Sequence, residues 1–297
     1  MRIFPERAVA FPYAPACLLR VSGPDAADFL QGQFTNDLAG IRPGGAVYGL
    51  WLDRRGRVVA DSHVILASDG SGFWIASVSS PSPVIARRLG DFIVADDVVI
   101  EDATAAWRGV ALIGAGTGAW LAAEPRAGMF FPGRRDSVEN WEWVHPAGES
   151  ASVDAATSGA RRAGASDVER MRVAAGIPSV PADIGPADLP NEGGLEALAI
   201  SYSKGCYLGQ EVMARLKSTG RVRRALVRVR GGGEPPRVPA ALWSGGRREG
   251  ELRSAVSDAA GGGYAGLALV SVAAGGGGGP FSLAAGEPPS VELALNS

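Results

Sequence analysis

Apolar residues near the N-terminus recur in two patterns, first as a short continuous run and then at helical spacing. The run CLLRV, which opens residues 17–38, is typical of a buried strand. Pro24 follows at a position suited to the first turn of a helix. Ala26, Phe29 and Leu30 then fall on one face, at spacings of three and four residues. Residues 17–38 are therefore predicted to form a strand followed by a helix.

Alternating apolar and polar positions continue the pattern downstream. Strands are predicted within 46–67, with a turn at Gly56, and at 72–78. A helix is predicted at 84–94, and the apolar run VALIG at 110–114 starts a second strand-to-helix unit. The two strand–turn–helix units indicate two similar halves of one region.

The second unit carries glycines that loosely resemble a dinucleotide-binding fingerprint. Gly114, Gly116 and Gly118 follow the predicted strand. However, Ala119 takes the place of the third small residue, and no acidic residue follows at a suitable distance. We interpret the segment as a glycine-rich turn that enters a helix.

A polar connection and one well-marked helix occupy the middle of the chain. Residues 146–165 are small and polar, which predicts an exposed connection. Ser166 and Glu169 have the spacing of a capping box, and the helix that they begin is predicted to end at Gly176.

The pattern of apolar and polar residues changes near residue 221. Strand-like alternation and glycine-rich turns replace the mixed pattern from there on. A length of 297 residues suits about two domains. We predict an α+β region over 1–220 and a small β domain over 221–297.

Composition and charge exclude several classes of protein. Hydrophobic residues make up 46% of the chain, enough for a sizeable core, and 29 Lys and Arg face 31 Asp and Glu. A net charge of −2 argues against strong nucleic-acid binding, which is typical of basic domains. No apolar run approaches the length of a membrane span, and the first residues lack the pattern of a signal peptide. We expect a cytoplasmic protein.

Cysteine and histidine are too scarce for a stable metal centre. The chain has only Cys17, Cys206, His63 and His145, with no closely spaced pair of ligands. Two distant cysteines in a reducing compartment are expected to be free thiols. We therefore expect no stably bound metal.

The segment around Cys206 is the best candidate for chemistry. The thiol lies in a glycine-flanked turn just before a predicted helix, and Lys204 adds a nearby positive charge. Both features favour the thiolate. Cys17, by contrast, lies within an apolar run. From spacing alone, Cys206 is either a reactive thiol or a structural one.

Several segments in order resemble one family. The octapeptide at 204–211, KGCYLGQE, resembles the KGCYxGQE signature of the YgfZ-type folate-binding proteins, which support iron–sulfur cluster assembly. VSGPDA at 21–26 and TND at 35–37 are similar to the opening segment of that family. PNEG at 190–193 falls where the related aminomethyltransferase, the T-protein of the glycine cleavage system, carries a Pro-x-Glu-Gly turn. Together these segments cover most of residues 20–225.

The resemblance implies a fold and a ligand. The expected fold is a T-protein-like α+β body around a central, folate-sized channel, followed by a small C-terminal β-barrel. The expected cofactor is tetrahydrofolate or a derivative. The expected partners are this folate and, through transient contacts, iron–sulfur proteins, and we expect a monomer.

The resemblance also assigns residues to the site. Its reactive centre would comprise Cys206, Lys204 and Asp61. Its folate-binding residues would be Arg172, Glu192, Tyr207, Gln210 and Glu211.

Two of these assignments have simpler alternatives. Glu192 matches the T-protein carboxylate that binds the pterin, and a carboxylate can accept two hydrogen bonds from a pterin edge. Its alternative is an acid that caps a turn. Asp61 lines up with the catalytic aspartate of T-proteins, although Ala60 replaces the first member of their paired aspartates. Its alternative is a solvated strand residue.

Three functions remain open at this point. The first is a folate-binding accessory factor for iron–sulfur protein maturation, a family role that extends to tRNA modification. The second is a tetrahydrofolate-dependent aminomethyltransferase centred on Asp61. The third is a non-catalytic ligand-binding module. The cysteine of the signature, which most T-proteins lack, favours the first.

Overall fold

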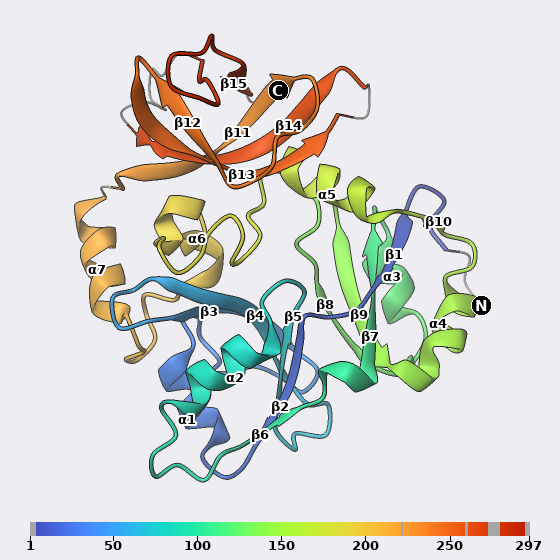
Figure 1. Cartoon of the computed structure of the whole chain (residues 1–297). Coiled ribbons are helices and arrows are strands. Elements are labelled where there is room, and N and C mark those ends of the chain that lie inside the picture. Colours follow the sequence, from blue (N-terminus) through green and yellow to red (C-terminus); the bar gives the residue numbers. More distant parts are fainter. Residues whose placement is uncertain (1–3, 221, 259–260, 273–279, 295–297) are drawn as a thin grey trace.

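Three five-stranded sheets organise the protein, which the computed structural model describes over residues 4–220, 222–258, 261–272 and 280–294 (Figure 1). The first sheet has the strand order β3-β4-β5-β2-β6, and neighbouring strands pair antiparallel. Its strands are β2 (Cys17–Ser22), β3 (Ala46–Leu52), β4 (Val58–Leu66), β5 (Phe73–Ser77) and β6 (Val99–Asp102).

The second sheet has the strand order β10-β1-β7-β9-β8. Only the contact between β1 and β10 is parallel. Its strands are β1 (Val9–Tyr13), β7 (Trp107–Ile113), β8 (Met129–Pro132), β9 (Asn140–Pro146) and β10 (Arg161–Arg162). The short helices that accompany it are η1 (Thr104–Ala106), α3 (Thr117–Ala122), η2 (Ala147–Glu149) and α4 (Ser150–Ala156).

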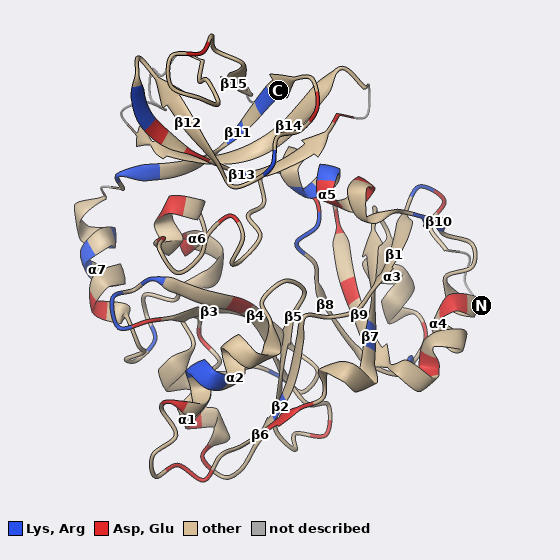
Figure 2. Cartoon of the chain, viewed as in Figure 1, with Lys and Arg blue, Asp and Glu red and all other residues tan. Residues whose placement is uncertain are grey.

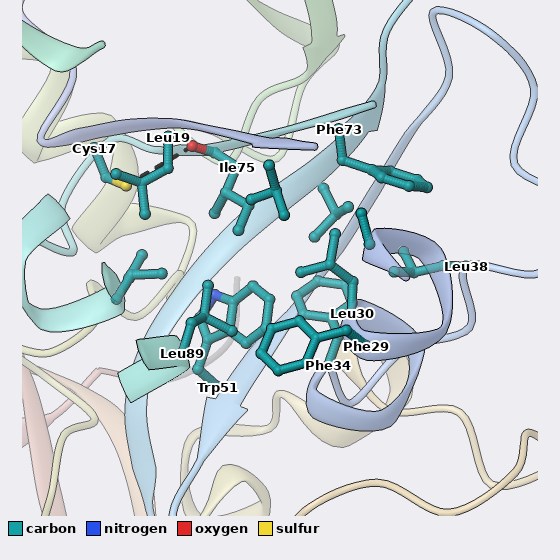
Figure 3. Close-up of a cluster of buried hydrophobic side chains, with 14 of the residues drawn as sticks. Cys17, Leu19, Phe29, Leu30, Phe34, Leu38, Trp51, Phe73, Ile75 and Leu89 are labelled. Carbon is teal, nitrogen blue, oxygen red and sulfur yellow. Dashed lines mark hydrogen bonds between the residues drawn. The ribbon is translucent and has the colours of Figure 1, made fainter. Parts of the chain in front are cut away.

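Two helices cover one face of the first sheet and bury its main core. These are α1 (Ala26–Gln33) and α2 (Ser82–Gly90). Figure 3 shows Leu30 and Phe34 packed with Trp51 in this core. Cys17 lies at its edge, with Sγ 3.7 Å from the carbonyl oxygen of Ile75. Burial of these large side chains is the main stabilising contribution of this half.

The opposite face of the first sheet packs against the second sheet. A fully buried apolar cluster fills the seam between them. Its members are Leu18, Ile65, Ala76, Phe131 and Val144. This seam places β4 between two layers, so its residues are shielded from solvent on both faces.

The third sheet has the order β12-β13-β14-β11-β15 and curls into a half-barrel (Figure 1). Single bridges join Phe281 to Val291 and Ser282 to Trp243, at its two edge strands. The closed barrel that the resemblance implies stays a prediction. The strands are β11 (Arg224–Gly232), β12 (Ala240–Ser244), β13 (Arg247–Ser257), β14 (Gly263–Ser271) and β15 (Val291–Leu293).

Further helices connect the sheets to one another. Helix α5 (Ala165–Ala174) packs against β13 and β14 through Val173, Val256 and Leu267. The remaining elements are η3 (Pro190–Gly193), α6 (Glu196–Ala199) and α7 (Gln210–Thr219).

The predicted strand and helix of residues 17–38 are confirmed as β2 and α1, and the second unit as β7 and α3. Gly114 and Gly116 adopt positive φ angles, +137° and +87°, which L side chains rarely adopt. The glycines therefore serve the turn, as we interpreted them. The predicted helix at 84–94 instead spans Ser82–Gly90.

Two predictions for residues 146–176 were wrong in detail. The polar connection at 146–165 contains η2 and α4, because its alanines and short side chains also suit helices. Helix α5 begins at Ala165 rather than after Ser166, since the carboxylate of Asp167 accepts a hydrogen bond (2.9 Å) from the backbone N–H of Gly164. Its predicted end at Gly176 is confirmed by a φ of +69° there.

Basic and acidic residues are interspersed along the elements of all three sheets (Figure 2). None of the helices in the described ranges has the length and apolar character that a membrane span requires.

Candidate functional site

Asp61 lies in the middle of β4 with only 7% of its surface exposed. One carboxylate oxygen accepts hydrogen bonds from the hydroxyls of Ser77 (3.2 Å) and Ser80 (2.8 Å). The other accepts one from the hydroxyl of Tyr48 (3.0 Å). The alternative of a solvated strand residue is therefore wrong, because the carboxylate of Asp61 is buried and accepts hydrogen bonds from three hydroxyl groups.

Arg134, from the hairpin between β8 and β9, supplies the positive charge beside Asp61. Its Nη1 lies 3.7 Å from Oδ2 of Asp61 and donates a hydrogen bond to the hydroxyl of Tyr48. Its guanidinium carbon lies 4.2 Å from the centre of the Tyr48 ring. Burial, and then the charge of Asp61, raise the pKa of Tyr48 well above its usual value. The phenol therefore stays protonated at neutral pH and can donate to Asp61 while it accepts from Arg134.

His63 follows two residues later on the same face of β4. Its ring centre lies 5.2 Å from that of Tyr48 and 4.5 Å from that of Phe131. Burial, assisted by the charge of Arg134, lowers the pKa of His63 to about 3. The imidazole is therefore neutral at physiological pH and acts as a packed aromatic ring.

These side chains enclose a cavity of about 40 Å³ between the first two sheets. It has room for a few water molecules, whereas a ligand of drug size needs roughly 300 Å³ or more. A folate-sized channel thus stays a prediction. The charged or titratable residues that border the cavity are Tyr48, Asp61, His63, Arg134, Arg135, Glu142 and Arg172.

Sequence reasoning missed the pair Arg135 and Glu142 at this cavity. Nε of Arg135 lies 2.7 Å from Oε1 of Glu142, whose side chain is 2% exposed. The guanidinium carbon of Arg135 lies 4.7 Å from the centre of the Tyr13 ring. The available signal was the position of Glu142 on β9, where Asn140 and Val144 on the same strand face are both buried. An acid in a line of inward-facing residues indicates a buried partner.

Glu192 lies in η3 and its carboxylate is held by Arg224 at the start of β11. Arg224 donates from Nε to Oε1 (2.9 Å) and from Nη2 to Oε2 (2.7 Å). Oε2 also accepts from the backbone N–H of Leu189 (2.9 Å), and Nη2 of Arg224 contacts Asp188 (3.0 Å). The turn-capping alternative therefore describes part of what Glu192 does. The rest is an ion pair that joins η3 to the third sheet.

Arg172 on α5 uses all of its nitrogens within the protein. Nη1 donates to Asp183 (2.6 Å) and to the carbonyl of Ile177 (2.6 Å). Nη2 donates to Ser254 of β13 (2.8 Å), and Glu169 accepts from both Nε and Nη2. Although Arg172 borders the Asp61 cavity, this network makes it a link between α5, the segment after it and the third sheet.

Lys204 is buried, and its ammonium group binds the end of α1. Nζ donates to the carbonyl oxygens of Gln31 (2.7 Å), Phe34 (2.8 Å) and Asn36 (2.8 Å). A cation at the C-terminal end of a helix satisfies carbonyls that lack partners within the helix. Burial lowers the pKa of Lys204 to about 8. Lys204 thus fixes the signature loop, which we define as residues 201–209, to α1.

Cys206 projects from the signature loop and is exposed, whereas Cys17 is fully buried. The loop is held next to α1 by a further hydrogen bond (3.3 Å) from the backbone N–H of Leu208 to the carbonyl of Gly32. Gly209 then begins α7 with a φ of +87°. The loop therefore presents the thiol from an ordered backbone.

The other signature residues divide between core and surface. Tyr207 packs in a buried cluster with Leu50 and Met213, and its hydroxyl finds no hydrogen-bond partner among the described residues. Gln210 is half-buried and Glu211 is exposed, both in the first turn of α7. Neither is among the residues that border the Asp61 cavity.

The predicted site residues thus lie in three places. Asp61 and Arg172 border the enclosed cavity. Glu192 lies at the contact with β11, and the signature loop with α7 forms a third location beside α1. Within the described ranges no group of three or more His, Cys, Asp or Glu side chains is arranged to hold a metal ion.

Comparisons with known proteins agree on one relationship. Residues 10–124 match the family model described as the GCVT N-terminal domain. The chain is 30% identical over 289 residues to the tRNA-modifying protein YgfZ of Edwardsiella ictaluri, covering 88% of this chain and 86% of that protein. It is 31% identical over 233 residues to the human mitochondrial iron–sulfur cluster assembly factor IBA57, covering 72% and 64%.

Among solved structures, the aminomethyltransferase T of the glycine cleavage system from Bartonella henselae is similar in fold. It aligns with a TM-score of 0.73 at 20% identity, over 90% of this chain and 79% of that one. This likeness shows a T-protein-like fold.

Proposed function

Because the chain belongs to the YgfZ family, we propose that it is a tetrahydrofolate-binding accessory factor that supports iron–sulfur cluster assembly or repair, with Cys206 as its reactive group. Relatives are named for iron–sulfur cluster assembly and for tRNA modification. The observation that carries the proposal is the exposed Cys206 on a loop that Lys204 anchors.

An anchored, exposed thiol suits transient contact with a partner. Cys206 is exposed on a loop whose backbone is already ordered by Lys204 and Leu208. Binding through such a loop avoids much of the entropy cost of ordering a flexible segment. Cys17 offers no competing thiol, since it is buried and its pKa is raised by burial.

Tetrahydrofolate binding is proposed at the Asp61 cavity. Its polar groups include the carboxylate of Asp61, the phenol of Tyr48 and the guanidinium of Arg134, and these are the kinds of groups that orient a heteroaromatic ligand. Arg134 comes from a hairpin and its side chain is 16% exposed, so it has solvent beside it into which it can move. We propose that Arg134 and Tyr48 swing away to enlarge the cavity when the ligand binds.

The contacts assigned to Glu192 and Arg172 would require an exchange of partners. Glu192 would have to release Arg224, and Arg172 would have to release Asp183 or Ser254. We therefore propose that folate recognition depends chiefly on Asp61, with Arg172 holding the cavity wall in place and Glu192 joining η3 to the third sheet.

A titration with tetrahydrofolate tests the ligand and its site together. We expect Asp61→Asn to weaken binding about tenfold or more, because a charge-assisted hydrogen bond contributes about 1.5–3 kcal/mol. Asp154→Asn is the matched control, since Asp154 is exposed and its ion pair with Arg162 lies on the surface. Equal dissociation constants for the wild type and Asp61→Asn would exclude Asp61 from the site. Cys206→Ser should bind tetrahydrofolate like the wild type, because the loop lies away from the cavity.

A further inference from the structure

A second, larger cleft lies between the first two sheets, at the C-terminal end of β4. Its volume is about 860 Å³, against about 40 Å³ for the Asp61 cavity. This exceeds the lower limit of volumes typical of ligand sites. The aromatic and apolar side chains that border it come from both sheets and from α3: Trp74, Trp107, Leu121, Met129 and Phe130.

Strand register separates the two cavities along a single face of the first sheet. Asp61, His63 and Ile65 alternate onto the same face of β4. Asp61 and His63 border the small cavity and Ile65 borders the cleft. Phe131 packs on His63 and belongs to the buried seam that includes Ile65. The cleft is therefore a separate site on the far side of an apolar barrier.

Two indole rings border the cleft. The ring centres of Trp74 and Trp107 are 5.2 Å apart with their planes inclined by 55°, and both side chains are only half-buried. Tryptophan faces that remain partly exposed in a concave site offer a surface on which a flat ring can stack. This favours a ligand with a planar aromatic ring.

Two arginines, Arg20 and Arg126, border the cleft and favour a negatively charged ligand. Arg20 lies opposite Trp74 in the register of β2 and β5, is exposed, and forms no ion pair with any described residue. Arg126 packs its guanidinium carbon 3.9 Å from the centre of the Trp120 ring, and Nη2 lies 3.8 Å from Glu124. Arg126 is thus already engaged, and Arg20 is available to a ligand.

The acids that border the cleft are also engaged. Glu124 pairs with Arg126. Asp69 accepts a hydrogen bond (2.9 Å) from the backbone N–H of Ser71, and hydrogen bonds from Ser71 lower its pKa. The charge of Arg20 adds to that lowering, so Asp69 lies close enough to oppose an anion at Arg20. Removing the charge of Arg20 should therefore weaken the binding of an anion, and removing the charge of Asp69 should strengthen it.

We propose that this cleft binds a planar heteroaromatic anion, with its ring against Trp74 and Trp107 and its phosphate or carboxylate at Arg20. Two sources share this chemistry, a purine mononucleotide and a folate. The proposal does not depend on the proposed function, because the cleft and the Asp61 cavity are separate.

Calorimetric titrations at low ionic strength with AMP and with 5-formyltetrahydrofolate test the proposal and distinguish the two sources. We expect one of these probes to bind, and Trp74→Leu to weaken its binding about tenfold, the loss typical of a stacking contact. Arg20→Gln should weaken it and Asp69→Asn should strengthen it, each about two- to fivefold as expected for surface charges. The matched control is Arg247→Gln, an exposed arginine on the third sheet that should leave binding unchanged.

Arg20→Gln and Asp69→Asn are exposed substitutions, so they keep the test valid if Trp74→Leu destabilises the fold. Binding of neither probe to the wild type at millimolar concentration would overturn the proposal. So would binding that is insensitive to both Trp74→Leu and Arg20→Gln. If 5-formyltetrahydrofolate binding is lost in Asp61→Asn but unchanged in the cleft variants, that ligand occupies the Asp61 cavity. The cleft proposal then rests on AMP alone, and it is overturned if AMP does not bind.

Discussion

The ammonium nitrogen of Lys204 lies 2.8 Å from the carbonyl oxygen of Phe34, the residue that ends α1. This contact joins segments 170 residues apart and anchors the signature loop. From the sequence, Lys204 was expected to supply positive charge to Cys206. The structure directs its three donors to the end of α1 instead, so its effect on Cys206 acts through the position of the loop.

We expect Lys204→Met to destabilise the protein. The substitution leaves three carbonyl oxygens near α1 without their donor, and a hydrogen bond to a charged group contributes about 1.5–3 kcal/mol net of its exchange with water. Urea unfolding should show a loss of about 2–3 kcal/mol in the free energy of unfolding. Arg215→Met, at an exposed position of α7, is the control and should cost little. An unchanged midpoint for Lys204→Met would contradict the anchoring role.

Cys206 should react with alkylating agents far faster than Cys17. Cys206 is exposed, whereas Cys17 is fully buried and burial raises the pKa of its thiol. The thiolate is the reacting species, and it must be reachable. Mass spectrometry after treatment with iodoacetamide should show a single adduct, at Cys206, until the protein is unfolded. Comparable rates at the two thiols would mean that the core around Cys17 opens readily.

His63 should make the protein sensitive to acid. Its pKa is lowered to about 3 in the folded state, against the usual 6.5, so the unfolded state binds the proton more tightly. Stability from this group is therefore complete above pH 6.5 and is lost as the pH falls toward 3. Between about pH 7 and pH 5 the loss should be about 2 kcal/mol.

His63→Gln removes that titration, so its free energy of unfolding should fall less steeply over the same range. Denaturant unfolding of both proteins at several pH values measures the difference. Parallel pH profiles for the wild type and His63→Gln would show that His63 is protonated without cost.

The pair of Arg224 and Glu192 should contribute to stability more than a surface ion pair does. Glu192 and the neighbouring Asp188 have buried side chains, so Arg224→Gln leaves Glu192 without its cation and leaves Asp188 with Arg253, whose Nη1 lies 3.4 Å from Oδ2. We expect a loss of about 2–3 kcal/mol, somewhat below that of a fully buried pair because Arg224 is partly exposed. Arg230→Gln, whose pair with Glu292 is exposed on both sides, should cost less than about 1 kcal/mol. Equal costs for the two variants would contradict the structural role of Glu192.

Local pattern was sufficient to predict four of the five strands of the first sheet and both helices that cover it, but in the second sheet it predicted only β7 and the helix α3 that follows. Pro24 and the spacing of Phe29 and Leu30 marked α1, and glycines with positive φ marked its counterpart at Gly114. The start of α5 was misplaced because Ser166 is a good N-cap residue, whereas in the structure Gly164 is the N-cap and Asp167, at the third helical position, accepts from its backbone N–H.

The site was harder to predict, because its partners are distant in sequence. The motif identified Cys206 and Lys204, but nothing local shows that Lys204 binds the end of α1. Arg134 reaches Asp61 across 73 residues, through the packing of one sheet on another. Such contacts depend on topology, which local periodicity does not encode.

The most direct test of the central claim is the activity of iron–sulfur enzymes in cells that lack their own YgfZ protein and carry this chain instead. Enzyme activity should be normalised to the amount of each enzyme and of this protein, with glycine cleavage measured in parallel. The account predicts that the wild type and Cys17→Ala restore iron–sulfur enzyme activity, that Cys206→Ser does not, and that glycine cleavage is the same in all strains. Full restoration of iron–sulfur enzyme activity by Cys206→Ser would contradict the account. So would glycine cleavage activity that rises with the wild type and is lost in Asp61→Asn, a result that would favour an aminomethyltransferase.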